Sequence, residues 1–183
     1  MYAPPGQVWC RRYPVHVDFA VGDLVVYGNH GVGSIAARKE QRVLGTKREV
    51  VVVELEEGLT VTLPLELAQS QLRPPASEAD LRRVREALRD DRTLSTVNWL
   101  SRRRETLEKL TAGTPVELAE IVSEGAQRER LRLEKGGKLS LSSSEREIFG
   151  KARRLLSGEI ALALDIQPAA AEGWIDKHLA RPA

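Results

Sequence analysis

Apolar residues recur with two different spacings along the chain, and the spacing changes near residue 74. Between Phe19 and Leu72 the sequence is dense in valine, leucine and isoleucine and is interrupted by glycine, a pattern typical of short β-strands. The short loops between them favour antiparallel pairing, and so few strands bury their apolar faces best in a strongly bent sheet. The expected strands are Leu24–Tyr27, Gly33–Lys39, Arg48–Leu55 and Leu59–Leu63.

After Pro74 the apolar positions recur at helical spacing. One helix is expected from about Ser95 to Ala112, where Gly113 can end it, and a shorter helix is expected after Pro168. The glycine- and serine-rich stretch 135–144 predicts an exposed loop. Three further helix starts are indicated by residue pairs with the spacing of a capping box: Ser77 with Asp80, Thr114 with Glu117, and Ser142 with Glu145.

The two spacings of apolar residues predict an α+β protein of two domains. Residues 19–73 are expected to form a small SH3-like or Tudor-like antiparallel β barrel, and residues 74–183 an all-α domain. Residues 1–18 are expected to form an N-terminal extension, for which disorder is one interpretation.

Composition narrows the functions that such a chain can have. The formal charge of +2 means that any contact with nucleic acid must come from a local basic patch. The single cysteine and the scattered histidines predict no disulfide and no metal site. We find neither a phosphate-binding glycine loop nor a nucleophile beside its base, so we expect no cofactor and no enzymatic activity. The absence of a long apolar run predicts a cytoplasmic protein with no membrane contact.

Aromatic and basic residues gather in the helix around residue 100. If Leu100 faces the core, Trp99 lies at the edge of the apolar stripe, with Arg102 and Arg103 one turn away. Guanidinium groups pair with phosphates, and an indole can stack on a base or insert into an opened step of the minor groove. The alternative is that Trp99 packs against a neighbouring helix above an ordinary solvated surface. Further arginines extend the basic character upstream, at positions 82, 83, 85, 89 and 92.

Three segments carry a resemblance to a known family. They are FAVGDLVVYGNHGVG at residues 19–33, NWLSRRRETLEKL at residues 98–110 and KARRLLSGEIALAL at residues 151–164. In this order they resemble the CarD/CdnL family of bacterial transcription regulators. The first segment is also similar to the polymerase-binding module of transcription-repair coupling factors, so the tryptophan segment behind it makes the match specific.

The resemblance implies a Tudor-like domain that binds the β subunit of RNA polymerase holding its housekeeping sigma factor. It also implies a helical domain that contacts promoter DNA at the upstream edge of the transcription bubble. Trp99 matches the family's minor-groove wedge, and Arg102 and Arg104 match basic positions that face the DNA backbone. With the adjacent Arg103 they form the predicted DNA-binding set. A wedge that fills an opened base step favours the open complex.

On the polymerase side we expect the exposed edge of the sheet and its basic residues to make the contact. The predicted set is Arg38, Arg42, Lys47, Arg48, Thr62 and Pro64, although an ordinary solvated barrel surface is the alternative. The chain departs from many relatives, which have arginine where it has Gln41, Thr62 and Ser101. These differences remove possible salt bridges to polymerase and one phosphate contact.

The main alternative function is that of a protein adaptor, which would use the barrel to recruit another factor and would not touch DNA. In either case we expect a monomer, and the resemblance implies association with the nucleoid through RNA polymerase.

Overall fold

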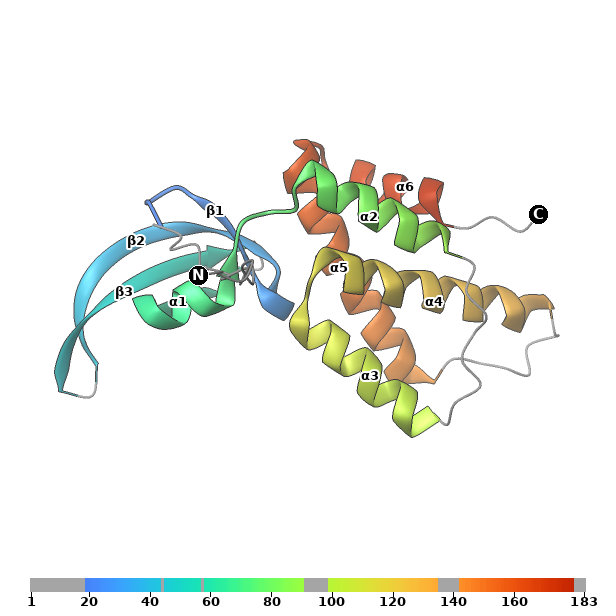
Figure 1. Ribbon diagram of the computed structural model, residues 1–183, viewed down its shortest axis with the longest axis horizontal. Coiled ribbons are helices and arrows are strands. Elements are labelled where there is room, and N and C mark those ends of the chain that lie inside the picture. The colour runs from blue at the N-terminus through green and yellow to red at the C-terminus, as the bar shows by residue number, and fades with distance from the viewer. Residues whose placement is uncertain (1–18, 44, 57, 91–98, 135–141, 180–183) are drawn as a thin grey trace, which may run out of the picture.

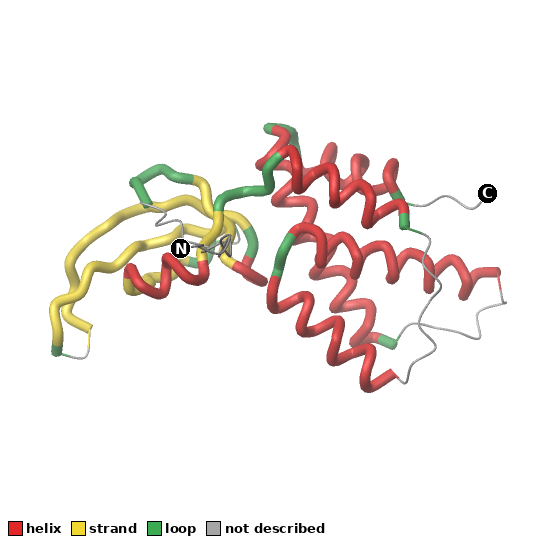
Figure 2. Tube along the Cα trace, viewed as in Figure 1, coloured by secondary structure: helices red, strands yellow, loops and turns green. Residues whose placement is uncertain are grey.

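The computed structural model describes residues 19–43, 45–56, 58–90, 99–134 and 142–179. They form a curved antiparallel sheet and a bundle of helices that lie side by side (Figure 1). A short connection after Arg73 leads from β5 to the first helix of the bundle (Figure 2). The predicted α+β class, with an N-terminal antiparallel sheet followed by helices, is confirmed.

The sheet has the strand order β4-β3-β2-β1-β5 and every neighbouring pair is antiparallel. The strands are β1 (Leu24–Tyr27), β2 (Val32–Val43), β3 (Thr46–Leu55), β4 (Thr60–Pro64) and β5 (Leu72–Arg73), with a 3-10 turn η1 (Gly28–His30) after β1. A register shift between Ile35 and Ala37 interrupts the β2–β3 pairing, and such bulges bend a strand.

The strands β2 and β3 are longer than predicted. Their outer parts are exposed at every described residue from Arg38 to Arg42 and from Thr46 to Glu49. A strand with neither face buried shows no alternation of apolar and polar residues, so the predicted strands end within the exposed parts, at Lys39 and Arg48.

A short helix and a fifth strand were not predicted. Helix α1 (Leu65–Gln71) begins after Pro64 and has no side-chain cap, so the signal that marks other helix starts is missing. Its Ala68 is completely buried, and Leu72 of β5 is 4% exposed. Both complete the core of the sheet unit, which consists of Phe19, Val25, Ile35, Val51, Val53, Leu55, Leu63, Ala68 and Leu72.

The helical unit comprises α2 (Glu78–Arg89), α3 (Trp99–Ala112), α4 (Pro115–Glu134), α5 (Ser143–Leu164) and α6 (Pro168–His178). The cap residues act as the sequence predicts. The Ser77 hydroxyl accepts a hydrogen bond from the Asp80 N–H, and the Ser142 hydroxyl accepts one from the Glu145 N–H. The Thr114 hydroxyl accepts from the Glu117 N–H at 3.3 Å. The expected start of α3 at 95–98 and most of the expected loop, at 135–141, lie outside the described residues.

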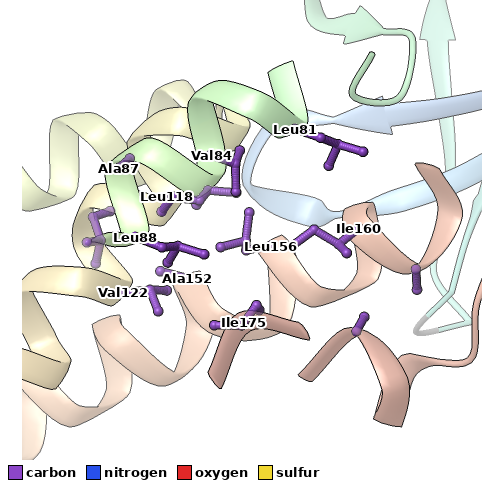
Figure 3. Close-up of a cluster of buried hydrophobic side chains, with 14 of the residues drawn as sticks. Leu81, Val84, Ala87, Leu88, Leu118, Val122, Ala152, Leu156, Ile160 and Ile175 are labelled. Atoms are coloured by element: carbon purple, nitrogen blue, oxygen red, sulfur yellow. The ribbon is translucent and has the colours of Figure 1, made fainter. Parts of the chain in front are cut away.

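Apolar residues at helical spacing form the core of this unit (Figure 3). Helix α2 contributes Leu81, Val84 and Leu88 to this cluster, and α5 contributes Leu156 and Ile160. Helix α4 packs against both α2 and α3 and so lies between them (Figure 1).

Candidate nucleic-acid interface

Helix α3 runs toward the sheet unit and ends beside it (Figure 1). Its last turn is followed by Gly113, which lies in backbone contact with Gly28 of the sheet unit. Fourteen helical residues span about 20 Å. The N-terminal end of α3 therefore lies well away from the sheet unit, although the C-terminal end of α4 extends farther from it (Figure 1). Position 99 is the first residue of this helix, and the Trp99 side chain lies outside the described part of the structure.

One face of α3 packs against the rest of the helical unit and so determines which residues of α3 are exposed. Leu110 is 6% exposed in the helical core, and Thr106 and Leu107 are half-buried. The Thr106 hydroxyl donates a hydrogen bond to the Arg102 carbonyl one turn earlier, at 2.9 Å. Because this face packs inward, Arg103 and Arg104 are left on the exposed side.

Arg102 differs from the two arginines that follow it. Its Nη2 lies 4.0 Å from Oε1 of Glu145, and the two side chains are 22% and 16% exposed. The other carboxylate oxygen of Glu145 accepts a hydrogen bond from the Ser142 N–H in the capping box of α5, at 2.9 Å. Arg102 thus ties α3 to the first turn of α5, and its positive charge is partly balanced within the protein.

Arg104 is available to an outside anion. Its side chain is 83% exposed, and its Nε lies 2.9 Å from Oε1 of Glu108 one turn later. An exposed pair at this spacing is worth about 0.3–0.5 kcal/mol, so a phosphate can displace Glu108 at little cost. Arg103 is exposed beside it. Of the predicted set, the structure therefore offers Arg103 and Arg104 to solvent and holds Arg102 between helices.

The arginines of α2 do not extend this surface, although they precede it in the sequence. Helix α4 lies between α2 and α3, and Arg82 and Arg83 pair with carboxylates of their own helix, Glu78 and Asp80. An arginine that the sequence did not single out, Arg146, is exposed on α5 next to Glu145. Its position at the same end of the unit as Arg102 depends on the packing of α5 against α3, for which the sequence contains no local signal.

The residues predicted for polymerase binding come together on three neighbouring strands. Arg42 and Lys47 pair across β2 and β3 near the end of that hairpin, and Arg48 lies opposite Gln41. Thr62 and Pro64 lie on β4, opposite Val52 and Val50.

Three of these cations have acidic neighbours at the surface. Arg38 pairs with Glu49, the Lys47 Nζ lies 3.9 Å from Glu40, and the Arg48 Nη1 lies 3.4 Å from Glu66. Arg42 is exposed. Exposed pairs of this kind contribute little to stability, so the same cations can exchange partners at an interface.

Strand β4 is an outer strand of the sheet. Among the residues that the structure describes, it pairs with β3 alone, and Thr60 and Thr62 are exposed while Leu63 is buried. An outer strand presents backbone N–H and C=O groups that another protein can pair with.

The described residues offer little for other chemistry. None of them form a group of three or more His, Cys, Asp or Glu side chains that could hold a metal ion. Within the described ranges, no helix combines the length and the apolar character needed to cross a membrane. His30 is exposed and stacks on the ring of Tyr27, with the ring centroids 4.8 Å apart. Cys10 lies outside the described residues.

Comparison with known proteins identifies both units. Residues 19–76 match the family model of the CarD-like/TRCF RID domain, and residues 83–176 match that of the CarD C-terminal domain. The chain is also 26% identical over 144 residues to a protein of Bacillus subtilis (strain 168) named "Putative transcription factor YdeB", across 78% of this chain and 90% of that protein. The chain thus belongs to the CarD/CdnL family of transcription regulators and carries the polymerase-interaction domain of that family.

Proposed function

We propose that this regulator binds the β subunit of RNA polymerase through its sheet unit and stabilises the promoter open complex through the distal end of α3. The main support is the course of α3, which starts well away from the sheet unit and runs toward it (Figure 1). The partner on the DNA side is the upstream edge of the transcription bubble, with polymerase carrying its housekeeping sigma factor.

The polymerase contact uses the outer strand β4 and the cations next to it. An extended segment of the β subunit can pair with the exposed edge of β4, on which Thr62 points outward. Arg42, Lys47 and Arg48 then lie on the neighbouring strands, where they can meet acidic residues of the partner. Threonine at position 62 adds no charge to this edge, so the positive charge beside it comes from Arg42, Lys47 and Arg48 on the neighbouring strands.

On the DNA side, Trp99 at the first position of α3 acts as the wedge. Unstacking a base step costs a few kcal/mol, and an indole that fills the gap offsets that cost only when the step is already open. By linkage, a protein that binds the open state better than the closed one shifts the equilibrium toward the open state. Arg103 and Arg104 hold the backbone beside the wedge, and Arg102 fixes α3 on α5 through Glu145.

The test is the lifetime of the open complex, measured on purified polymerase holoenzyme and a promoter that opens weakly. The wild-type chain should lengthen this lifetime. Trp99→Ala should abolish the increase without weakening the binding of the chain to polymerase, because position 99 lies far from the sheet. A lifetime that Trp99→Ala leaves unchanged rules out the wedge.

A pair of matched arginine variants tests the surface around the wedge. Arg104→Ala and Arg82→Ala each remove an exposed arginine that pairs with a glutamate one turn away, on α3 and on α2. We expect Arg104→Ala to shorten the lifetime of the open complex and to reduce its salt dependence, whereas Arg82→Ala should have no effect. Equal effects of the two variants would mean that α3 is not the contacting helix.

Crosslinking separates this proposal from the adaptor alternative. A photoreactive residue at position 99 should crosslink to promoter DNA near the upstream edge of the bubble. If polymerase is bound but position 99 reaches only protein, the chain acts as an adaptor without direct DNA contact.

A further inference from the structure

A buried ion pair joins the sheet unit to the helical unit. Arg73, the last residue of β5, directs its guanidinium group to Glu159 of α5. Its Nη2 lies 2.7 Å from Oε2 of Glu159, and its Nη1 donates to the other carboxylate oxygen. The same Nη2 donates to the carbonyl oxygen of Gly113, between α3 and α4, at 2.7 Å. One side chain of the sheet unit thus bonds to two separate segments of the helical unit.

The burial of this pair is uneven. The Glu159 side chain is 1% exposed, whereas that of Arg73 is 27% exposed. A carboxylate buried this completely needs a partner that balances its charge and satisfies both of its oxygens. The planar guanidinium does so with two parallel bonds, and this geometry fixes the direction of approach as well as the distance.

Backbone contacts close the same junction. Gly113, with φ of +62°, lies against Gly28, with φ of +41°, and a Cβ atom at position 113 would lie 2.8 Å from the carbonyl carbon of Gly28. A Cβ atom at Gly31 would lie 3.4 Å from a methyl group of Leu155 on α5. Since no side chain separates Gly28 from Gly113, there is no flexible atom between them that could absorb a change in their spacing. We call Arg73, Glu159, Gly28 and Gly113 the interdomain joint.

We propose that the interdomain joint holds the two units as one rigid body, and that Arg73 and Glu159 are positioning residues that direct the distal end of α3. The structural part of this inference stands on the contacts alone, whereas its consequence for promoter opening rests on the proposed function. When the sheet unit is bound to polymerase, the joint determines where position 99 lies relative to DNA. A loss of the joint leaves both binding surfaces intact but no longer aligned.

The distance between the two units tests the structural part without polymerase. Spin labels are placed on α1 and α2, at Ser70→Cys and Glu86→Cys, in a chain with Cys10→Ser, and the distribution of label distances is measured by double electron–electron resonance. The wild-type joint should give one narrow distribution. Arg73→Met should broaden it, and Gly113→Ala should shift or broaden it because the new methyl group meets the backbone of Gly28.

The chain contains a matched control. Arg153 has a side chain of 33% exposure and pairs with Glu172 and Asp176, but all three residues lie inside the helical unit. Arg153→Met should therefore leave the distance distribution narrow. If Arg73→Met does not fold, Arg73→Lys keeps the charge without the two parallel bonds and should still broaden the distribution. A wild-type distribution in the folded Arg73 and Gly113 variants would overturn the inference.

Promoter opening tests the functional part. Arg73→Met should bind polymerase within about twofold of the wild-type affinity, because the polymerase-binding strands are unchanged, yet it should lose the lengthening of open-complex lifetime. If the variant broadens the distance distribution and still lengthens the lifetime like the wild type, Arg73 is not a positioning residue. If the wild-type chain itself does not lengthen the lifetime, the proposed function fails, while the distance measurement still decides whether the joint is rigid.

Discussion

The uneven burial of the Arg73–Glu159 pair predicts that the two partners contribute unequally to stability. Arg73→Met leaves a carboxylate of 1% exposure without its cation, and removal of one partner from a buried pair costs about 3–5 kcal/mol. Glu159→Met leaves an arginine that is 27% exposed, which water can partly solvate. Glu159→Met should therefore lower the free energy of unfolding by about as much as the loss of one hydrogen bond to a charged group, about 2 kcal/mol.

The double variant Arg73→Met/Glu159→Met completes the cycle. Replacing both members of a buried pair with apolar side chains of similar size is often close to neutral, so the double variant should lose about 1 kcal/mol or less. It should thus be more stable than Arg73→Met alone, with a coupling energy above about 2 kcal/mol. Arg153→Met, in which a half-exposed pair is broken, should lose less than about 1 kcal/mol.

Urea unfolding followed by circular dichroism at the helix band measures these free energies of unfolding. If the free energy falls with urea concentration at the same slope in every variant, the folded and unfolded states being compared are the same. Two results would refute the reasoning. One is a loss in Glu159→Met that equals or exceeds the loss in Arg73→Met. The other is a double variant whose loss is the sum of the two single losses, because the residues would then not be coupled through a buried pair.

Two other predictions concern local structure. The hydrogen bond from the Ser77 hydroxyl, together with that from the Ser77 backbone, lowers the pKa of Asp80, so Ser77→Ala should raise this pKa in a carboxyl chemical-shift titration. Because the pKa of Asp80 is lower in the folded than in the unfolded chain, the stability that this carboxylate contributes is fully present above the unfolded pKa and is lost as pH falls through the folded pKa. A pKa of Asp80 that Ser77→Ala leaves unchanged would contradict this cause. Gly33→Ala should destabilise the sheet by about 1–3 kcal/mol in thermal unfolding, because its Cβ would lie 2.4 Å from the Glu54 carbonyl oxygen. Gly173→Ala, in a helix with no atom within 4 Å, should be neutral or stabilising, and equal losses in both variants would contradict the steric argument.

The helix starts could be predicted because their signals are local. A hydroxyl at the cap and a carboxylate three residues later satisfy free N–H groups of the first turn, so Ser77 and Ser142 mark α2 and α5 without reference to the rest of the fold. Helix α1 has no such cap. It is held by the burial of Ala68 in the sheet core, a tertiary effect that seven residues of sequence do not reveal.

The candidate DNA surface could be predicted only in part. The sequence indicates that arginines follow Trp99 on one helix, but it does not distinguish Arg102, which pairs with Glu145, from the exposed Arg104. That distinction depends on the packing of α3 against α5. Likewise, Arg73 and Glu159 are 86 residues apart, and each in isolation resembles an ordinary surface charge. Burial, which makes the pair informative, appears only when the two units are in contact.

The modest charge of the chain agrees with the proposal that this regulator reaches DNA only after it has bound polymerase. Most of the affinity of proteins for any DNA comes from phosphate neutralisation, yet the formal charge here is +2 and Arg102 and Arg104 already have acidic partners. A more basic helical unit would bind duplex throughout the genome. If the sheet unit anchors the chain, the distal end of α3 acts at a high effective concentration and needs little affinity of its own. A rigid joint strengthens this effect, because the two units do not have to be ordered against each other on binding. If the proposed function holds, the few kcal/mol that separate a closed from an opened base step are then enough to decide when α3 binds.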